Sequence, residues 1–209
     1  MSSTSSPVRV ARSIPRTTAE GPGTRFALWV QGCTLQCPGC FNPHLWTQRG
    51  GDLVAPETLL DAVPADVEGV TLLGGEPFEQ AGPLAVFAAL VRQRGQSVMT
   101  FTGFTLDDLR RKESGDVDAL IAQTDLLVDG PFLKDQVDLA RPWVGSRNQR
   151  FHALGPRYRT LVDELDGIGD RLEIRVSADG TVSVNGWAPT ATLDLILADL
   201  GRRQSRTRR

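Results

Sequence analysis

The sequence predicts an α/β fold, a partial, open (β/α) barrel followed by a β-hairpin and a helix. Short apolar runs alternate with stretches of helical periodicity, which is typical of βαβ units with parallel strands. The chain has 209 residues, of which 40% are hydrophobic and 23% charged, as in an ordinary soluble globular domain. Four to six strand–helix units are too few for a closed eight-stranded barrel, which takes about 250 residues.

The first two predicted strands, 26–30 and 70–73, are continuous apolar runs, as expected for buried strands. A helix is expected over 56–63, where a proline stands near the first turn. A longer amphipathic helix is expected over 78–94, interrupted early by Gly82-Pro83.

Two further strands are predicted at 97–102 and 126–128, with helices near 106–112 and 119–123 between them. In folds of parallel strands, active sites lie at the carboxyl ends of the strands. Polar or glycine-rich segments follow each predicted strand, so we expect the site at that edge. These segments are 33–40, 74–77, 102–104 and 129–130.

The last third of the chain has a different pattern. Residues 172–176 and 181–184 alternate around Ala178-Asp179-Gly180, which predicts a hairpin, and a final helix is expected from about Ala191 to Arg202. The sequence thus predicts four regions. They are a disordered N-terminus (1–8), the barrel (9–170), the hairpin and helix (171–203) and a disordered basic tail (204–209).

All three cysteines of the chain, Cys33, Cys37 and Cys40, lie in one loop that contains Pro38 and Gly39. Three cysteine ligands leave one iron of a four-iron cluster without a protein ligand, and an open metal position is typical of catalytic sites. A structural zinc site is an alternative, for which His44 would be a fourth ligand.

Composition excludes several classes of partner. The formal net charge of −2 gives no reason to expect nucleic acid or an anionic membrane. No apolar run reaches the length of a membrane span, and the Ser/Thr-rich N-terminus lacks the apolar stretch of a signal peptide. Cysteines that are expected to stay reduced indicate the cytoplasm.

The cysteine spacing, three residues and then two, resembles that of the radical S-adenosylmethionine enzymes. The resemblance implies a partial barrel of the radical S-adenosylmethionine type, with a [4Fe–4S] cluster and S-adenosyl-L-methionine as cofactors. Cys33, Cys37 and Cys40 would bind iron. Gly74, Gly75 and Glu76, after the second strand, would bind S-adenosylmethionine.

A closer resemblance is carried by an ordered set of short motifs over about residues 18 to 154. The chain is similar to the activating proteins of anaerobic (class III) ribonucleotide reductase. This implies an oxidoreductase that generates a glycyl radical on a protein partner, with a flavodoxin or ferredoxin as electron donor. The motifs are 21–25, 29–32, 40–43, 102–104, 127–132 and 145–149.

Other residues carry weaker expectations. Thr102 and Asp129, at later strand ends, would line the same cofactor pocket. Asn148 and Gln149 match the family pattern, and they are equally well explained as hydrogen-bonding a loop to the barrel. Gly39 stands where many radical S-adenosylmethionine enzymes have an aromatic residue, with Phe41 nearby.

Two alternatives remain open on the sequence. One is a radical S-adenosylmethionine enzyme that modifies a peptide or a small molecule, which the C-terminal extension favours. The other is a non-catalytic iron–sulfur or zinc-binding module. The sequence does not identify the substrate, the target glycine, the electron donor or the oligomeric state.

Overall fold

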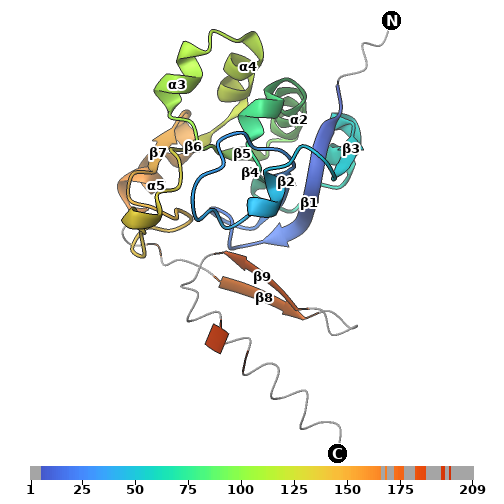
Figure 1. Ribbon diagram of the computed structural model, residues 1–209. Coiled ribbons are helices and arrows are strands. Elements are labelled where there is room, and N and C mark those ends of the chain that lie inside the picture. The colour runs from blue at the N-terminus through green and yellow to red at the C-terminus, as the bar shows by residue number, and fades with distance from the viewer. Residues whose placement is uncertain are drawn as a thin grey trace, which may run out of the picture.

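The computed structural model describes residues 6–165, residue 168, the strands at 172–176 and 182–186, and residues 194, 195 and 198. Within these residues, seven strands form one sheet in the order β3-β1-β2-β4-β5-β6-β7, and β8 and β9 pair separately (Figure 1). The sheet strands are β1 (Val8–Thr17), β2 (Arg25–Val30), β3 (Asp52–Val54), β4 (Gly69–Gly74), β5 (Ser97–Phe101), β6 (Leu126–Asp129) and β7 (Arg150–Ala153).

Four strands at the centre of the sheet, β2, β4, β5 and β6, run parallel, as the alternating pattern predicts. The flanking strands β1, β3 and β7 pair antiparallel to their neighbours. The mixed α/β class is therefore confirmed. The sheet is open, with β3 and β7 at its edges, and its strand order does not establish a barrel.

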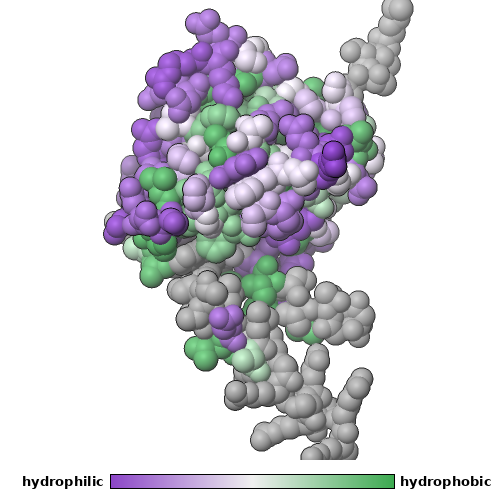
Figure 2. All heavy atoms as spheres, in the orientation of Figure 1, coloured by the Kyte–Doolittle hydropathy of each residue, from purple (hydrophilic) through white to green (hydrophobic). Residues whose placement is uncertain are grey.

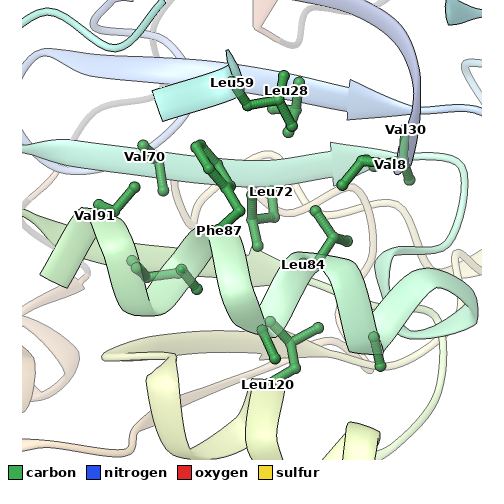
Figure 3. Close-up of a cluster of buried hydrophobic side chains, with 14 of the residues drawn as sticks. Val8, Leu28, Val30, Leu59, Val70, Leu72, Leu84, Phe87, Val91 and Leu120 are labelled. Carbon is green, nitrogen blue, oxygen red and sulfur yellow. The ribbon is translucent and has the colours of Figure 1, made fainter. Parts of the chain in front are cut away.

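The first four helices cover one face of the sheet, and their apolar sides form the largest core with β1, β2 and β4 (Figures 1 and 3). Leu161 and Val162 of the fifth helix pack against a second core that contains Met99 of β5 and Leu126 and Val128 of β6. Figure 3 shows Leu84 and Phe87 of the central helix directed toward Leu72 of β4. The helices are α1 (Pro56–Asp61), α2 (Ala81–Gln93), α3 (Leu106–Arg111), α4 (Gly115–Gln123) and α5 (Arg159–Asp163), with short 3₁₀ turns at η1 (Pro43–Leu45), η2 (Pro77–Gln80), η3 (Lys134–Gln136) and η4 (Pro156–Tyr158).

The helix expected over 78–94 is confirmed with a different beginning. Residues Pro77–Gln80 form the 3₁₀ turn η2, and α2 starts at Ala81. Gly82 and Pro83 therefore lie in the first turn of α2, where a proline costs no backbone hydrogen bond. The Gly-Pro pair marks the start of the helix and does not interrupt it.

Three strands were absent from the sequence prediction. β1 begins at Val8, the last residue of the predicted disordered segment, and contains Pro15 and three arginines. β3 is only three residues long, and β7 has one exposed and three half-buried residues. Strands that are short or partly exposed, as these three are, lack the continuous apolar run that identifies buried strands.

The predicted hairpin is confirmed: β8 (Leu172–Val176) pairs antiparallel to β9 (Val182–Gly186). Its predicted turn at Ala178–Gly180 lies outside the described residues, as does most of the final helix expected from Ala191. The division of the chain into four regions stays a prediction. In the part of the chain that the structure describes, no helix has the length and apolarity that a membrane crossing requires.

Candidate active site

The carboxyl ends of the four parallel strands meet at one edge of the sheet. Val30 of β2 pairs with Gly74 of β4, and Phe101 of β5 pairs with Val128 of β6. The cysteine loop and the segments after β4, β5 and β6 leave from this edge, as the parallel arrangement predicts. An open cavity of about 590 Å³ lies among these segments, which we call the cysteine cavity.

The cysteine cavity brings together most of the residues expected at the site. Cys33, Cys37 and Cys40 all line it, together with Gly74, Gly75, Glu76 and Thr102. Residues separated by about seventy positions in the chain thus share one cavity. Its other lining residues are Leu35, Trp46, Phe101, Gly103, Gly130, Phe132 and Gln149.

The three cysteines are free thiols, each partly exposed. Burial raises the pKa of the Cys33 thiol, and nearby backbone N–H groups oppose that rise. The backbone N–H of Asn42 lies 3.4 Å from Cys40 Sγ and donates to it, a contact that suits a thiolate ligand. A loop with three such sulfur donors beside an open cavity fits the ligand set of an iron–sulfur cluster.

No group of three or more His, Cys, Asp or Glu side chains among the described residues is arranged to hold a single metal ion. Cysteines that bind different irons of one cluster need not converge on one point. His44, the fourth ligand of the zinc alternative, is exposed in η1, and its carbonyl oxygen accepts a hydrogen bond from Gln31 Nε2 at 3.3 Å.

The two glycines after β4 allow this strand end to contact the start of the cysteine loop. Gly74 has φ +106°, and a Cβ at this position would lie 2.7 Å from Trp29 Cα. A Cβ on Gly75 would lie 2.2 Å from the carbonyl oxygen of Gly32. Side chains are therefore excluded here by the approach of two backbones. The backbone N–H groups of Gly75 and Glu76 donate to the carbonyl oxygens of Val30 and Gly32, each at 2.8 Å.

Glu76 is buried, and its carboxylate joins the ends of β4 and β5. Its Oε1 accepts hydrogen bonds from the N–H of Phe78 and from Thr102 Oγ1, and its Oε2 accepts one from the N–H of Gly103, all at 2.9 Å. Burial raises the pKa of Glu76 to about 7, although these donors oppose the rise. Thr102 thus contributes to the cavity partly by positioning Glu76.

The raised pKa makes the stability of the apoprotein depend on pH. A carboxyl group whose pKa rises from 4.5 to about 7 on folding stabilises the fold fully below about pH 4.5 and loses that contribution as the pH rises through 7. We expect the unfolding free energy of the wild type to fall by about 3 kcal/mol over that interval relative to Glu76→Gln, whose side chain cannot titrate. Urea denaturation of both apoproteins at a series of pH values measures the difference. A difference that is independent of pH would mean that folding does not shift the pKa of Glu76.

Asp129 ends β6 and is engaged by the protein itself. Its carboxylate accepts hydrogen bonds from the N–H of Leu106 at 2.7 Å and from Arg150 Nε and Nη2 at 3.1 and 2.8 Å, and His152 Nε2 lies 3.0 Å away. Burial alone would raise its pKa, but these donors lower it. The adjacent Gly130, not Asp129, lines the cysteine cavity. A direct contact of Asp129 with a cofactor stays a prediction.

The motif at 145–149 positions the loop after β6. Asn148 Nδ2 donates to the carbonyl of Pro131 at 2.7 Å, and Gln149 Nε2 donates to that of Gly130 at 3.3 Å. Gln149 Oε1 accepts from the N–H groups of Gly145 and Ser146. These contacts correspond to the loop-holding role considered from the sequence. Gln149 also lines the cysteine cavity, a placement that the sequence gave no means to predict.

Arg25 belongs to the motif at 21–25, but sequence reasoning gave it no role. It lies at the opposite end of the strands, at the start of β2. Its fully buried guanidinium donates to Thr71 Oγ1, Ser97 Oγ, Tyr158 Oη and the carbonyl oxygen of Val70, among others. Burial lowers its pKa, opposed by the neighbouring Tyr158 and Glu68. The sequence shows only an arginine immediately before an apolar strand. This pattern does not tell whether the arginine side chain is buried or exposed.

Comparison with known proteins gives a family for residues 19–152, which match the sequence model of the 4Fe-4S single cluster domain. The anaerobic ribonucleoside-triphosphate reductase-activating protein of Vibrio cholerae is 34% identical over 149 residues, covering 66% of this chain and 93% of that protein. The protein of the same name from Salmonella typhimurium is 33% identical over 158 residues, covering 70% of this chain and 99% of that protein.

Among solved structures, QueE from Escherichia coli superposes with a TM-score of 0.40 at 19% identity, over 47% of this chain and 54% of that one. The family match spans the cysteine loop, the glycine-rich segment after β4 and all four parallel strands. The chain belongs to the 4Fe-4S single cluster domain family, in which its similar relatives are the activating proteins of anaerobic ribonucleoside-triphosphate reductase.

Proposed function

We propose that this protein is a radical S-adenosylmethionine activating enzyme that generates a glycyl radical on anaerobic ribonucleotide reductase. The single observation that carries the proposal is the cysteine cavity. It places three cysteines and the segment Gly74–Glu76 around one open space at the carboxyl ends of parallel strands. The names of the relatives supply the reaction and the protein partner.

In this proposal Cys33, Cys37 and Cys40 would hold a [4Fe–4S] cluster, which would leave one iron without a protein ligand. When bound, the cluster supplies the single electron that cleaves S-adenosylmethionine to methionine and a 5′-deoxyadenosyl radical, which takes a hydrogen atom from a glycine Cα of the partner. The protein contributes the thiolates, a cavity of limited size, and groups that orient the substrate.

Gly74, Gly75 and Glu76 orient S-adenosylmethionine in this proposal. The glycines let the end of β4 lie against the start of the cysteine loop, so that both segments line the cavity together. Glu76 offers a carboxylate at low dielectric, where attraction to the ammonium group of the methionine moiety is stronger than in water. An ammonium placed there favours the ionised form of Glu76 and so opposes the effect of burial on its pKa.

Thr102 and Asp129 act less directly. Thr102 Oγ1 donates to Glu76, and Asp129 fixes the end of β6 and the start of α3 through its contacts with Arg150 and Leu106. Their proposed role is to hold the two later strand ends in place beside the cofactor.

Three further assignments belong to the proposal. The open sheet corresponds to the partial barrel of radical S-adenosylmethionine enzymes, the protein works in the cytoplasm, and a reduced flavodoxin or ferredoxin donates the electron. The partial barrel and the electron donor follow from the family resemblance. The cytoplasm follows from cysteines that must stay reduced to bind iron.

The test is anaerobic reconstitution of the protein with iron and sulfide, followed by reduction with dithionite in the presence of S-adenosylmethionine. We expect 5′-deoxyadenosine, measured by chromatography. With the anaerobic reductase of the same organism added, we also expect a glycyl radical detected by electron paramagnetic resonance. Zinc in place of iron, with no 5′-deoxyadenosine, would overturn the proposal in favour of a structural metal module. Cleavage without a glycyl radical on the reductase would favour a peptide or small molecule as the substrate.

A further inference from the structure

The β8–β9 hairpin presents its polar side to the rest of the protein. Glu173 Oε2 accepts a hydrogen bond from Thr17 Oγ1 at 2.5 Å, and Arg175 donates to the carbonyl oxygen of Arg16. On β9, buried Asn185 accepts from Arg12 Nη2 at 3.2 Å. The hairpin is therefore attached to β1 through polar contacts.

The opposite side of the hairpin is apolar and faces away from β1. Because side chains alternate along a strand, Leu172, Ile174 and Val176 share one side of β8. Ile174 pairs with Val184 of β9, so these two side chains also lie on the same side. We call Leu172, Ile174, Val176 and Val184 the outer face of the hairpin.

The outer face reverses the usual polarity of a surface hairpin, which turns its apolar side to the core. Ile174 is 36% exposed and Val176 is 59% exposed. Figure 2 shows apolar atoms at the surface in the region of the hairpin. Leu172 and Val184 are half-buried, so Ile174 and Val176 form the exposed part of this face. Exposed apolar patches are often sites where proteins interact.

The hairpin also forms part of a second cavity, with an empty volume of about 850 Å³. Gly186, which pairs with Leu172 across the hairpin, lines this cavity, and its N–H donates to Glu20 Oε1 at 3.2 Å. The outer face therefore ends beside the cavity. We call this space the hairpin cavity.

The hairpin cavity adjoins the cysteine cavity, and several residues line both. One of them is the proposed iron ligand Cys40. The shared residues are Cys40, Gly74, Phe101, Phe132 and Gln149. A chain that entered beside Gly186 would thus lie against residues, Cys40 among them, that also line the cysteine cavity.

The lining of the hairpin cavity suits a polypeptide with apolar side chains. Phe41 and Phe132 pack edge to face, with their ring centroids 5.7 Å apart. Trp143 also lines this cavity, and its backbone has a φ of +64°. A positive φ on a bulky residue costs about 1–2 kcal/mol and is often found at functional sites. Glu20 adds one carboxylate near the hairpin.

We propose that the outer face and the hairpin cavity together form the docking surface for the protein substrate. A folded polypeptide partner rests apolar surface on the outer face and extends a loop past Gly186 and Glu20 toward Cys40. This inference rests on the proposed function, since a docking surface for a protein is needed only if the substrate is a protein. The position of this surface beside the cysteine cavity, with Cys40 in the lining of both, favours this occupant over a second copy of the chain.

The hairpin makes this surface particular to the chain. The family match ends at residue 152, and β8 begins at Leu172. The cysteine cavity belongs to the shared family domain, whereas the outer face does not. We therefore expect the hairpin to govern which partner is accepted and to leave the cleavage of S-adenosylmethionine unchanged.

The test compares Val176→Glu with Leu53→Glu. Both residues are 59% exposed, but Leu53 lies on edge strand β3 and lines neither of these two cavities. With the reductase of the same organism as substrate, we expect Val176→Glu to raise the KM for the reductase at least about tenfold, as one lost apolar contact of about 1.4 kcal/mol would do. Leu53→Glu should stay within about twofold of the wild type. Both variants should form 5′-deoxyadenosine at the wild-type rate without reductase.

Equal KM values for the two variants would overturn the docking surface. So would sedimentation analysis in which a wild-type dimer becomes a monomer in Val176→Glu, because the outer face would then join two copies. A loss of folding in Val176→Glu, seen by circular dichroism, would mean that the outer face packs against the chain itself. The rate of 5′-deoxyadenosine formation without reductase tests the proposed function separately.

Discussion

Replacing Cys37 by alanine should abolish formation of 5′-deoxyadenosine, leaving only the background rate. We expect this loss because the cluster needs all three cysteine ligands. Cys37 is the central cysteine of the three that line the cysteine cavity. With it removed, two irons of a four-iron cluster lack protein ligands, and the loop no longer provides enough thiolates to hold the cluster. Iron and sulfide analysis after reconstitution should show a matching loss of the cluster.

The control is Thr34→Ala in the same loop. Thr34 is exposed, and its hydroxyl and N–H both bind Glu79 Oε1, so the change removes one surface hydrogen bond and no thiolate. We expect normal cluster content and a rate within about threefold of the wild type. If Cys37→Ala kept its cluster and its activity, the cysteine loop would not be the iron site.

Replacing Arg25 by alanine should lower the unfolding free energy of the apoprotein by about 3–5 kcal/mol. The buried guanidinium connects the beginnings of β2, β4 and β5 through Thr71, Val70 and Ser97. Its removal leaves a cavity and several buried polar groups without their donor. Denaturation in urea, followed by circular dichroism, measures the loss.

The matched control is Arg16→Ala. Arg16 forms an ion pair with Asp66 at 2.6 Å, but both side chains are largely exposed, so its removal should cost less than about 1 kcal/mol. Arg25→Lys should recover part of the loss, since it keeps the charge without the fork of donors. Equal effects of Arg25→Ala and Arg16→Ala would show that the buried network contributes little to stability.

These two predictions separate the two ends of the sheet. The Arg25 network lies where the parallel strands begin, and the cysteine cavity lies where they end. We therefore expect Arg25→Ala to act mainly on stability and Cys37→Ala mainly on chemistry. A similar division between a stabilising end and a catalytic end is general in folds with parallel strands.

The central strands could be predicted because burial on both faces leaves a continuous apolar run, as at 26–30 and 70–73. Strands β1 and β7 could not be predicted in this way. Many of their residues are partly or fully exposed, so their local sequence resembles that of a loop. Pairing with distant residues, such as Val10 with Val30, decides their conformation.

The sequence by itself determined the chemistry of this protein. Three cysteines at fixed spacing and the segment Gly74–Glu76 are local features whose types alone limit what they can bind. Only the tertiary structure decided how such residues are used. In the fold, Glu76 is buried and its pKa is raised, and Asp129 accepts hydrogen bonds from Arg150. The side chain of Arg25 is buried, and the apolar side of the hairpin is exposed. The physical reason is that burial, desolvation and hydrogen-bond partners depend on residues that are distant in the chain and adjacent only in the fold.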